Sequence, residues 1–560
     1  LNYIIDDSNN VKNQSLLKHR IMGLTSHFPD MYQLLPKYQK STDFIVVKLE
    51  MSDFQFGVYE EARVQERKLE QNNKKKKKQQ KDDVYSDSVS TYRIFSRAFC
   101  NFVFPRPDIK RPFPNDDDNI ETAINDENLD AIVDTDKLKE GEVFDADQID
   151  EADKIDRHDE DIDDIDDVDG EGAEDLSKIK TSAITKNTKK ALYEKKIREA
   201  IKNLEKNGEK YLTREALTTY SPKFLNILEN LGDAKYRGLH LIYSQFRTLE
   251  GIGILKLVLE ANGFVEFKIK KSAGGDWVID IAKENYGKPK FALYTGTETV
   301  EEREIVRNIF NNNTNILPAS IVGELKTISE TNLYGDIIKV LMITASGAEG
   351  INLKNVRYVH ITEPYWHPVR IEQVIGRARR ICSHSDLPIE LQTVQVFLYL
   401  MTFSKSQLES DVSIELRLKD KSKKDGKTPL TSDEALHEIS TIKETINKNL
   451  LTTIKESAID CSIHIRAGSK EKLQCFSIGN PDKNNFSYLP NINQQEVDKM
   501  ASKNKQEITW KAIKVKIEGI EYALRKETGE VYDLDSYKQK NPLLIGNLEI
   551  KGKEYKFTKL

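Results

Sequence analysis

The chain has 560 residues, of which 85 are basic and 91 acidic, and its net charge is −6. It is 38% hydrophobic and 31% charged, and no apolar run comes near the about 20 residues that cross a bilayer, which argues against a membrane-embedded protein. The first residues lack the basic-then-apolar layout of a secretory signal, and the first residue is Leu rather than Met, which is compatible with a fragment.

Cysteine usage indicates reduced thiols. The four cysteines form no CxxC pair, and no Cys/His cluster has the spacing of a zinc site. They are Cys100, Cys382, Cys461 and Cys475. We expect all of them to be free thiols in a reducing compartment.

The net charge hides a strong asymmetry. Residues 116–175 hold 28 acidic and 4 basic side chains, a net of −24, so the other 500 residues carry +18. A basic body suits a polyanionic partner such as nucleic acid. The alternative is that the surplus lysines only keep the surface soluble.

The N-terminal third alternates between ordered and low-complexity stretches. Residues 1–64 look globular, whereas 65–90 include five consecutive lysines and predict a flexible loop, with a phosphate contact or a nuclear-import signal as alternatives. Residues 91–114 are apolar and aromatic, which predicts an ordered connector. Residues 115–178 are acidic with few aromatics, which predicts a disordered insertion that is either a spacer or a shield for the basic body.

Residues 190–402 show the pattern of a parallel α/β sheet. Ser221 and Pro222 mark the start of a helix that Gly232 ends. Strands and helices then alternate, and ligands of such sheets bind at the carboxyl ends of the strands. The expected strands are 239–244, 291–294, 339–344, 357–362 and 394–401, and the expected helices between them are 249–261, 299–310 and 368–380.

Two further segments follow the sheet. Residues 403–500 predict a charged helical extension, and 505–560 alternate between apolar and polar residues with glycine turns, which predicts a small β-rich module. The fold class is therefore α/β, a parallel sheet with flanking helices, with a long disordered acidic insertion and a small β-rich C-terminal module.

Residues 339–380 carry the strongest chemical signal. The strand KVLMIT runs into ASGAEG, where backbone amides could approach a phosphate, although any tight strand-to-helix turn uses such residues. On the later helix, Gln373, Arg377 and Arg380 stand at i, i+4 and i+7 and so share one face, which Gly376 leaves open. Two guanidiniums there could grip the β- and γ-phosphates of a nucleotide and stabilise charge during phosphoryl transfer. The alternative is a basic surface helix.

Other side chains are weaker candidates. Trp366 suits either stacking on a base or packing beside the helix that follows it. His360 lies on a buried strand, which indicates a satisfied core histidine. The sequence DEAL at 433–436 indicates a helix start capped by Thr431 or Ser432.

The ordered motifs resemble those of superfamily 2 helicases. LHLIYSQF (239–246), FALYTGTETVEEREIVRNIFN (291–311), SGAEGINL (346–353) and QVIGRARR (373–380) are similar to motif IV, the stretch after it, motif V and motif VI, in family order and spacing. The resemblance covers about 190–402, the second RecA-like lobe, and YSPKF at 220–224 looks SWI/SNF-like.

At lower specificity, residues 1–64 look like the tail of the first RecA-like lobe and a linker. There RIMGLTSHFPD (20–30) and MSDFQFGVYEEAR (51–63) resemble the large-DNA-virus helicases of the mimivirus and phycodnavirus type, distantly similar to the poxvirus nucleoside triphosphatase I. TSDEALHEIS (431–440) and IKESAIDCSIH (454–464) look like the same viral group.

The resemblance implies roles for individual residues. Arg377 and Arg380 would be arginine fingers that complete an ATP site at the lobe interface, and Gln373 would couple nucleotide state to nucleic acid. The other candidates are the ATP-coupling residues Gly347, Glu349, Gly350, Asn352 and Gly376 and the nucleic-acid-binding residues Ser244, Gln245 and Ser346.

The resemblance also implies an ATP site that is only half present. No G-x-x-x-x-G-K-[ST] occurs, because Gly426-Lys427-Thr428 lacks the first Gly, and the DExx-like 433–436 stands after motif VI. ATP with Mg²⁺ would bind mainly to a preceding lobe, and we expect no metal ligand in this chain. We expect the chain alone not to hydrolyse ATP at a useful rate.

The sequence thus predicts the C-terminal part of an ATP-dependent nucleic-acid helicase or translocase, with translocation favoured. The expected partners are nucleic acid, DNA rather than RNA, and by analogy a viral transcription machinery. The expected location is the host cytoplasm, in a viral factory, or the virion, with the nucleus also open. The alternative is a non-catalytic nucleic-acid-binding or regulatory protein built on a lone helicase lobe.

Overall fold

The structure is a computed structural model that divides into two compact units. The larger consists of residues 29–450 with 7–10, and the smaller of 451–560 with 1–6 and 11–28. The residues described are 12–26, 34–77, 93–113, 193–295, 298–344, 350–461, 473, 475, 478–479, 488–489, 512–517, 520–526, 528–538, 543–551 and 554–559.

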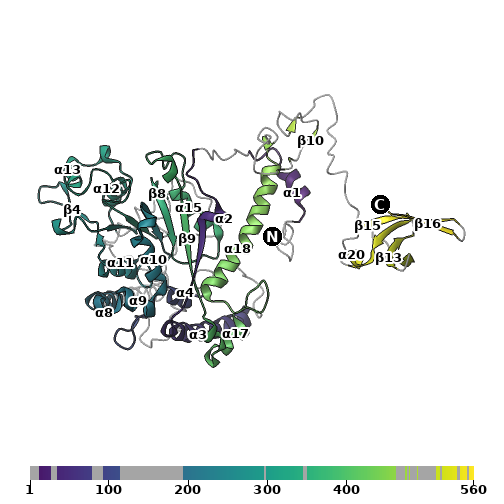
Figure 1. The fold of residues 1–560 in the computed structure, drawn as a ribbon, viewed down its shortest axis with the longest axis horizontal. Coiled ribbons are helices and arrows are strands. Elements are labelled where there is room, and N and C mark those ends of the chain that lie inside the picture. Colours follow the sequence, from purple (N-terminus) through teal and green to yellow (C-terminus); the bar gives the residue numbers. More distant parts are fainter. Residues whose placement is uncertain are drawn as a thin grey trace, which may run out of the picture. The chain divides into compact units, whose positions relative to one another are not determined.

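The larger unit is built on a seven-stranded sheet in which every neighbouring pair is parallel (Figure 1). In spatial order the strands are β1 (Phe44–Glu50), β9 (Gln395–Thr402), β8 (Val356–Ile361), β2 (Leu239–Tyr243), β7 (Val340–Ile343), β6 (Lys290–Tyr294) and β3 (Val265–Glu266). The expected α/β class with a parallel sheet is confirmed.

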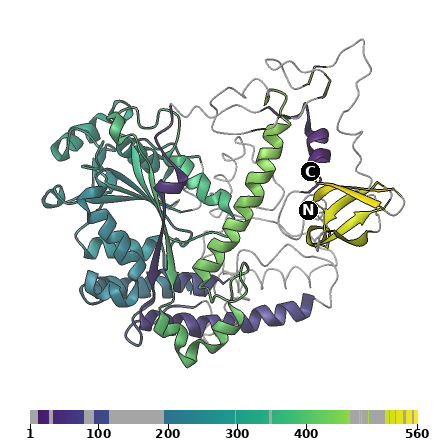
Figure 2. The same ribbon diagram turned by 45° about the vertical axis from the view of Figure 1, so that its right-hand side comes forward.

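Helices cover both faces of this sheet (Figure 2), as parallel sheets require. On β2, Ile242 packs with one core, whereas Leu241 and Tyr243 pack with the other, because successive strand side chains point to opposite faces. The first core takes residues from α4 (Ile94–Asn101), α10 (Pro222–Gly232) and α11 (Ile252–Ala261), and the second from α12 (Val300–Phe310), α13 (Ala319–Ile328) and α15 (Pro368–Ala378).

Smaller elements complete the larger unit. They are α2 (Lys40–Asp43), α3 (Asp53–Lys77), α8 (Gly208–Tyr211), α9 (Arg214–Tyr220), the hairpin β4 (Ile269–Lys271) and β5 (Trp277–Ile279), α16 (Lys405–Glu409), α17 (Ile414–Lys419) and most of α18 (Ser432–Glu456). None of the helices among the described residues has the length and apolarity that a membrane crossing takes.

The structure corrects two N-terminal expectations. Within 1–64, β1 pairs with β9 from Phe44↔Val396 to Glu50↔Thr402, so this strand belongs to the sheet of 190–402 and not to another lobe. Strand β9 is apolar along its length and needs a neighbour on each side, which β1 supplies. The expected loop 65–90 is also wrong in its first half, because α3 continues to Lys77, with Arg67 buried on it.

Other boundaries shift by a few residues or remain as predictions. Helix α4 lies within the expected connector 91–114, and Ser221 caps α10 by accepting from the Phe224 amide at 3.1 Å, with Pro222 at its first position, as predicted. Residues 115–178, the acidic stretch, lie outside the described residues.

A buried ionic cluster joins α3 and α4 to the segment after α17. The carboxylate of Asp420 accepts from Arg63 at 3.0 and 3.1 Å, from Arg67 at 2.7 Å and from Arg93 at 2.9 Å. Burial alone would raise the pKa of Asp420, but attraction to Arg93 and Arg63 outweighs it and lowers that pKa. Through these pairs, Asp420 holds the N-terminal helices α3 and α4 against the segment between the sheet and α18.

Helix α18 begins as expected for the DEAL sequence. The Thr431 hydroxyl accepts from the Glu434 amide at 3.0 Å, and the Glu434 carboxylate accepts from the Thr431 amide at 3.2 Å. This reciprocal cap confirms a helix start rather than a catalytic box.

The smaller unit contains α1 (Gln14–Ile21), the end of α18 and a separate sheet. Five antiparallel strands run in the order β12 (Ile513–Ile517), β13 (Ile520–Arg525), β14 (Glu530–Asp533), β15 (Leu544–Lys551) and β16 (Glu554–Lys559), with α20 (Leu534–Lys538) between two of them. A two-stranded pair, β10 (Ile478–Gly479) and β11 (Tyr488–Leu489), precedes it. The expected β-rich module is confirmed.

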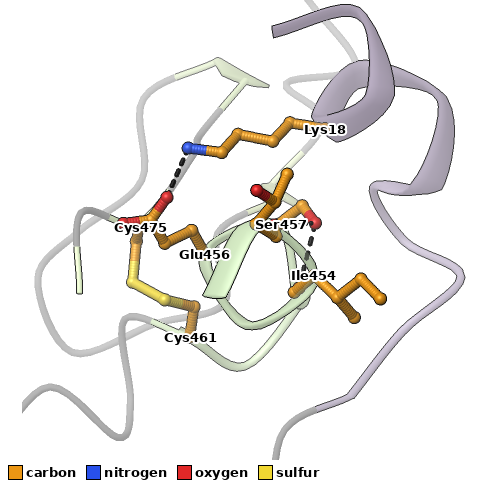
Figure 3. The surroundings of a disulfide bond; sticks show 7 residues. Lys18, Ile454, Glu456, Ser457, Cys461 and Cys475 are labelled. Atoms are coloured by element: carbon orange, nitrogen blue, oxygen red, sulfur yellow. Dashed lines mark hydrogen bonds and ion pairs between the residues drawn. A yellow bond between two sulfur atoms is a disulfide. The ribbon is translucent and has the colours of Figure 1, made fainter. Parts of the chain in front are cut away.

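A disulfide corrects the expectation of four free thiols. Cys461 and Cys475 are joined beside the Lys18–Glu456 ion pair at the end of α18 (Figure 3). Cys100 and Cys382 are free, the first buried and the second exposed. A separation of 14 residues without a CxxC pattern gave the sequence no signal of this pairing.

The Asp420 cluster generates a stability prediction. Replacing Asp420→Asn should lower the free energy of unfolding by about 3–5 kcal/mol, because the buried Arg63 and Arg67 and the partly buried Arg93 lose their shared carboxylate. Urea titration followed by circular dichroism measures this. The matched control is Glu61→Gln in the exposed Arg106 pair, which should cost at most about 1 kcal/mol. Equal small losses would contradict the assignment.

The same carboxylate sets the direction of a pH effect. The pKa of Asp420 is lowered on folding, so its stabilisation is complete above the unfolded value of about 3.9 and is lost as the pH falls through the folded value. The stability difference between wild type and Asp420→Asn should therefore shrink on acidification below about pH 4.

Candidate functional site

The candidate residues gather where three adjacent strands end. Strand β8 leads into Glu363, β2 into Ser244 and Gln245, and β7 into Thr344. Because parallel strands end at one edge of a sheet, these positions are neighbours. Ser346, Gly347 and Glu349 lie outside the described residues, and their roles stay predictions.

Ser244 and Gln245 are held beneath the surface. The Ser244 hydroxyl lies 3.1 Å from each carboxylate oxygen of Glu363, and the Gln245 amide donates to the same carboxylate. The Gln245 side chain accepts from Arg97, and both residues are buried. The structure thus brings them to the expected edge but does not expose their side chains, so their contact with a phosphate backbone stays a prediction.

Glu363 is the residue that sequence reasoning missed. It is fully buried, and burial raises its pKa, although hydrogen bonds from Gln245 and Asn101 act in the opposite direction. An acidic residue directly after an apolar strand, followed by Pro364, was the available signal. It did not reveal that the carboxylate turns inward.

The turn after β2 is tight and exposes Arg247. The Ile252 amide donates to the Phe246 carbonyl at 2.9 Å, and a Cβ at Gly251 would lie 1.8 Å from that oxygen. Glu250 adopts φ 50°. The turn therefore requires glycine and has little freedom, and Arg247 is the exposed charged residue in it.

Helix α15 presents the motif VI residues. His367 caps it by accepting from the Val369 amide at 3.2 Å, and Pro368 opens its first turn. Its apolar residues Ile371, Val374, Ile375 and Ala378 are buried against the sheet. On the other side, Gln373 is exposed and Arg377 half-buried, as their shared face predicts.

Arg380 does not lie on this face, which corrects the sequence prediction. The helix ends at Ala378, and Arg379 leaves it with φ −113° and ψ 77°. The Arg380 amide instead donates to the Ser383 hydroxyl at 3.3 Å. No glycine or proline marks this helix end in the sequence. The prediction therefore extended the helix, and its i+7 position, beyond the point where α15 stops.

The end of motif V is partly described. Gly350 has φ 73°, a left-handed conformation that favours glycine, and the Asn352 side chain is exposed. The Asn352 carbonyl accepts from the Asn311 side chain at 2.8 Å, which fixes this segment to the end of α12. The coupling role that the resemblance implies for Gly350 and Asn352 stays a prediction.

Helix α18 packs beside the α15 region. Lys40 pairs with Glu372 of α15 at 2.7 Å and with Glu444 of α18 at 2.5 Å. The Lys443 ammonium lies 3.7 Å from the centre of the Trp366 ring. Trp366 is half-buried, and a cation of α18 lies over its ring, so stacking on a base and packing beside α15 both stay predictions.

His360 is a core residue, as expected. It bonds His240 at 3.0 Å and the Tyr399 hydroxyl at 2.7 Å, and burial lowers the pKa of His360 to about 3. His384 bonds Ser383 and the Val356 carbonyl, both at 2.9 Å. Within the described ranges, no cluster of His, Cys, Asp and Glu has the makings of a metal site.

Part of this region matches a known protein family. Residues 324–382, which include α15, match the helicase conserved C-terminal domain. A protein of Acanthamoeba polyphaga mimivirus, named as an ATP-dependent RNA helicase (R350), is 25% identical over 474 residues, 81% of this chain and 48% of its own length. A termination factor NPH-I homolog of African swine fever virus (isolate Pig/Kenya/KEN-50/1950) is 29% identical over 379 residues, 62% of this chain and 47% of its own.

Among solved structures, the C-terminal part of the Fun30 ATPase domain is 14% identical over 74% of this chain and 99% of that one. Its TM-score of 0.29 is too low to equate elements of the two. Residues 324–382 thus match a helicase C-terminal domain, and the chain is similar to viral proteins named as an ATP-dependent helicase and as a termination factor. It spans about half the length of the curated relatives it matches.

The glycines of this site differ in what they tolerate. A Cβ at Gly376 meets nothing within 4 Å, so Gly376→Ala should stabilise α15 by about 0.5–1 kcal/mol through helix propensity. Gly251→Ala, the control, should be strongly destabilising because its Cβ would overlap the Phe246 carbonyl. Thermal unfolding of both variants measures the change in stability. A loss of stability in Gly376→Ala would contradict the open space beside Gly376.

Proposed function

We propose that this chain is the C-terminal part of an ATP-dependent nucleic-acid helicase or translocase, in which Arg377 completes an ATP site shared with a preceding lobe. The observation that carries the proposal is the match of 324–382 to a helicase C-terminal domain together with the place of Arg377. This side chain is half-buried on the polar face of α15, beside Gly376, whose missing side chain leaves space.

The chemistry asked of Arg377 is electrostatic. Phosphoryl transfer spreads negative charge over the oxygens of the transferred group, and a guanidinium positioned there lowers the barrier. The packed side of α15 fixes the helix against the sheet, so its polar face is presented in one orientation. In this proposal exposed Gln373, one turn earlier, responds to nucleotide occupancy, and Gly350 and Asn352 carry that change toward nucleic acid.

Arg380 takes a secondary part in this proposal. Its backbone, which bonds Ser383, lies beyond the helix, so the geometry of α15 does not orient its guanidinium. Mg²⁺ would accompany ATP, with ligands supplied by the preceding lobe. Since no P-loop sequence occurs among these 560 residues, the chain alone should not turn over ATP.

Nucleic acid is the proposed polymer substrate. The basic body outside 116–175 and the exposed Arg247 at the strand ends support it. One relative is named as an RNA helicase and another as a termination factor, so the expected preference for DNA finds no support in these names. A role in viral transcription, in a viral factory or the virion, follows from the same relatives as a proposal.

A non-catalytic binding protein is the second candidate, and the absence of a P-loop sequence favours it. The two candidates differ in the reading frame around the chain. Expression of the complete frame and measurement of ATP turnover with and without nucleic acid decides between them. Turnover stimulated by DNA or by RNA supports the first, and no turnover with retained binding supports the second.

The arginine assignment predicts a selective loss. In the complete protein, Arg377→Ala should lower ATP turnover by about 10³-fold or more, because the transition-state charge loses its partner, while nucleic-acid affinity changes little. The control is Arg370→Ala on the same helix, whose guanidinium lies over the Tyr365 ring and should matter little for turnover. Equal loss of turnover and affinity in Arg377→Ala would contradict the role.

A further inference from the structure

The carboxylate of Glu363 is an acceptor on which separate segments converge. Ser244 and Gln245 donate to it from the turn after β2, and Asn101 at the end of α4 donates to it at 3.1 Å. All of these groups are fully or almost fully buried. A buried carboxylate is acceptor-only, so it can satisfy this set of donors, whereas a neutral side chain of the same size cannot.

The Asn101 side chain that donates to Glu363 is itself oriented by a buried cation. The Asn101 side-chain carbonyl accepts from the buried Lys223 ammonium at 2.9 Å, and this ammonium donates to Asp433 at 2.7 Å. Arg97 reaches the same turn through Gln245. Because Lys223 fixes the orientation of the Asn101 amide, its NH₂ group must face Glu363 and cannot turn to accept.

The turn is clamped a second time at its far end. Arg111 bonds both carboxylate oxygens of Glu250 at 2.7 and 3.0 Å, and both residues are buried. The Arg111 guanidinium also lies 5.0 Å from the centres of the Phe95 and Phe113 rings. Between the two clamps stands Arg247, exposed on a backbone that Gly251 keeps tight.

We propose that Glu363 is a positioning residue that fixes the turn 244–251 so that Arg247 contacts a phosphate of bound nucleic acid. The inference rests on the proposed function and deepens it, because it moves the contact from buried Ser244 and Gln245 to the exposed residue beside them. Glu363 itself touches no ligand. It acts through the hydrogen bonds that it accepts from the Ser244 hydroxyl and the Gln245 amide.

The test uses salt dependence, which counts phosphate contacts. Each contact contributes about 0.7–0.9 to the slope of log affinity against log salt, depending on the strand form. Affinity of the 560-residue chain for fluorescent single-stranded DNA, single-stranded RNA and duplex DNA is measured by anisotropy between about 50 and 200 mM salt. Arg247→Ala should reduce the slope by about one contact.

Glu363→Gln should produce the same reduction without touching Arg247. Its new NH₂ group would face the donors of Ser244 and Asn101, and the turn would lose its fixed position. Adding Asn101→Asp restores an acceptor opposite that NH₂ group and keeps the Lys223 ammonium paired. The double variant should therefore recover the wild-type slope. Asn101→Asp alone would place two carboxylates against each other, at positions 101 and 363, and should not show the wild-type slope.

The outcomes separate this inference from the proposed function. No binding by the wild type would count against nucleic acid as substrate altogether. Binding with an unchanged slope in Arg247→Ala, or in folded Glu363→Gln, would overturn the positioning role alone. Circular dichroism verifies folding. If Glu363→Gln does not fold, Glu363→Asp replaces it, because it keeps the charge but withdraws it from the donors. Glu363→Asp should show the same reduced slope of log affinity against log salt. An unchanged slope in this variant refutes the inference.

Discussion

A buried ammonium group links segments that are far apart in this sequence. Lys223 on α10 is fully buried, and its charge is acceptable there only because Asn101 and Asp433 accept from it. Asp433 also accepts from the Met401 amide at the end of β9. One ionic interaction thereby fixes α4, α10, α18 and the sheet to one another, and the site at the strand ends is built on that arrangement.

The parallel sheet imposes the second constraint. Each of its central strands is buried on both faces and needs a hydrogen-bonded neighbour on each side. For β9 that neighbour is β1, which lies some 350 residues earlier in the chain. The N-terminal segment therefore completes the sheet and also delivers α4 with Asn101 and Arg97, which hold the turn after β2.

Sequence patterns predict the structural features that depend on residues close together in the chain. The Ser221-Pro222 helix start, the Thr431 cap and the strands around motifs IV to VI follow from local patterns, and the structure contains them. The pairing of β1 with β9 could not be predicted, because the sequence of an apolar strand does not specify which other strand it pairs with.

The end of α15 at Ala378 escaped for a different reason. Arg379 and Arg380, which follow it, are good helix formers, but the local bond from the Arg380 amide to the Ser383 hydroxyl, three residues later, prevails over their propensity. The inward turn of Glu363 likewise depends on donors from β2 and α4, which no local pattern relates to it.

Burial separates the arginines that maintain the structure from those that can meet a ligand. Arg63, Arg67 and Arg111 are buried against carboxylates, and their charge is already neutralised. Arg247 and Arg377 reach the surface, one after β2 and one on the helix that follows β8, and these two strands are neighbours. Glu363 lies in the connection from β8 to α15 and holds the turn that carries Arg247. The same connection therefore contacts the turn that carries Arg247 and leads into the helix that carries Arg377.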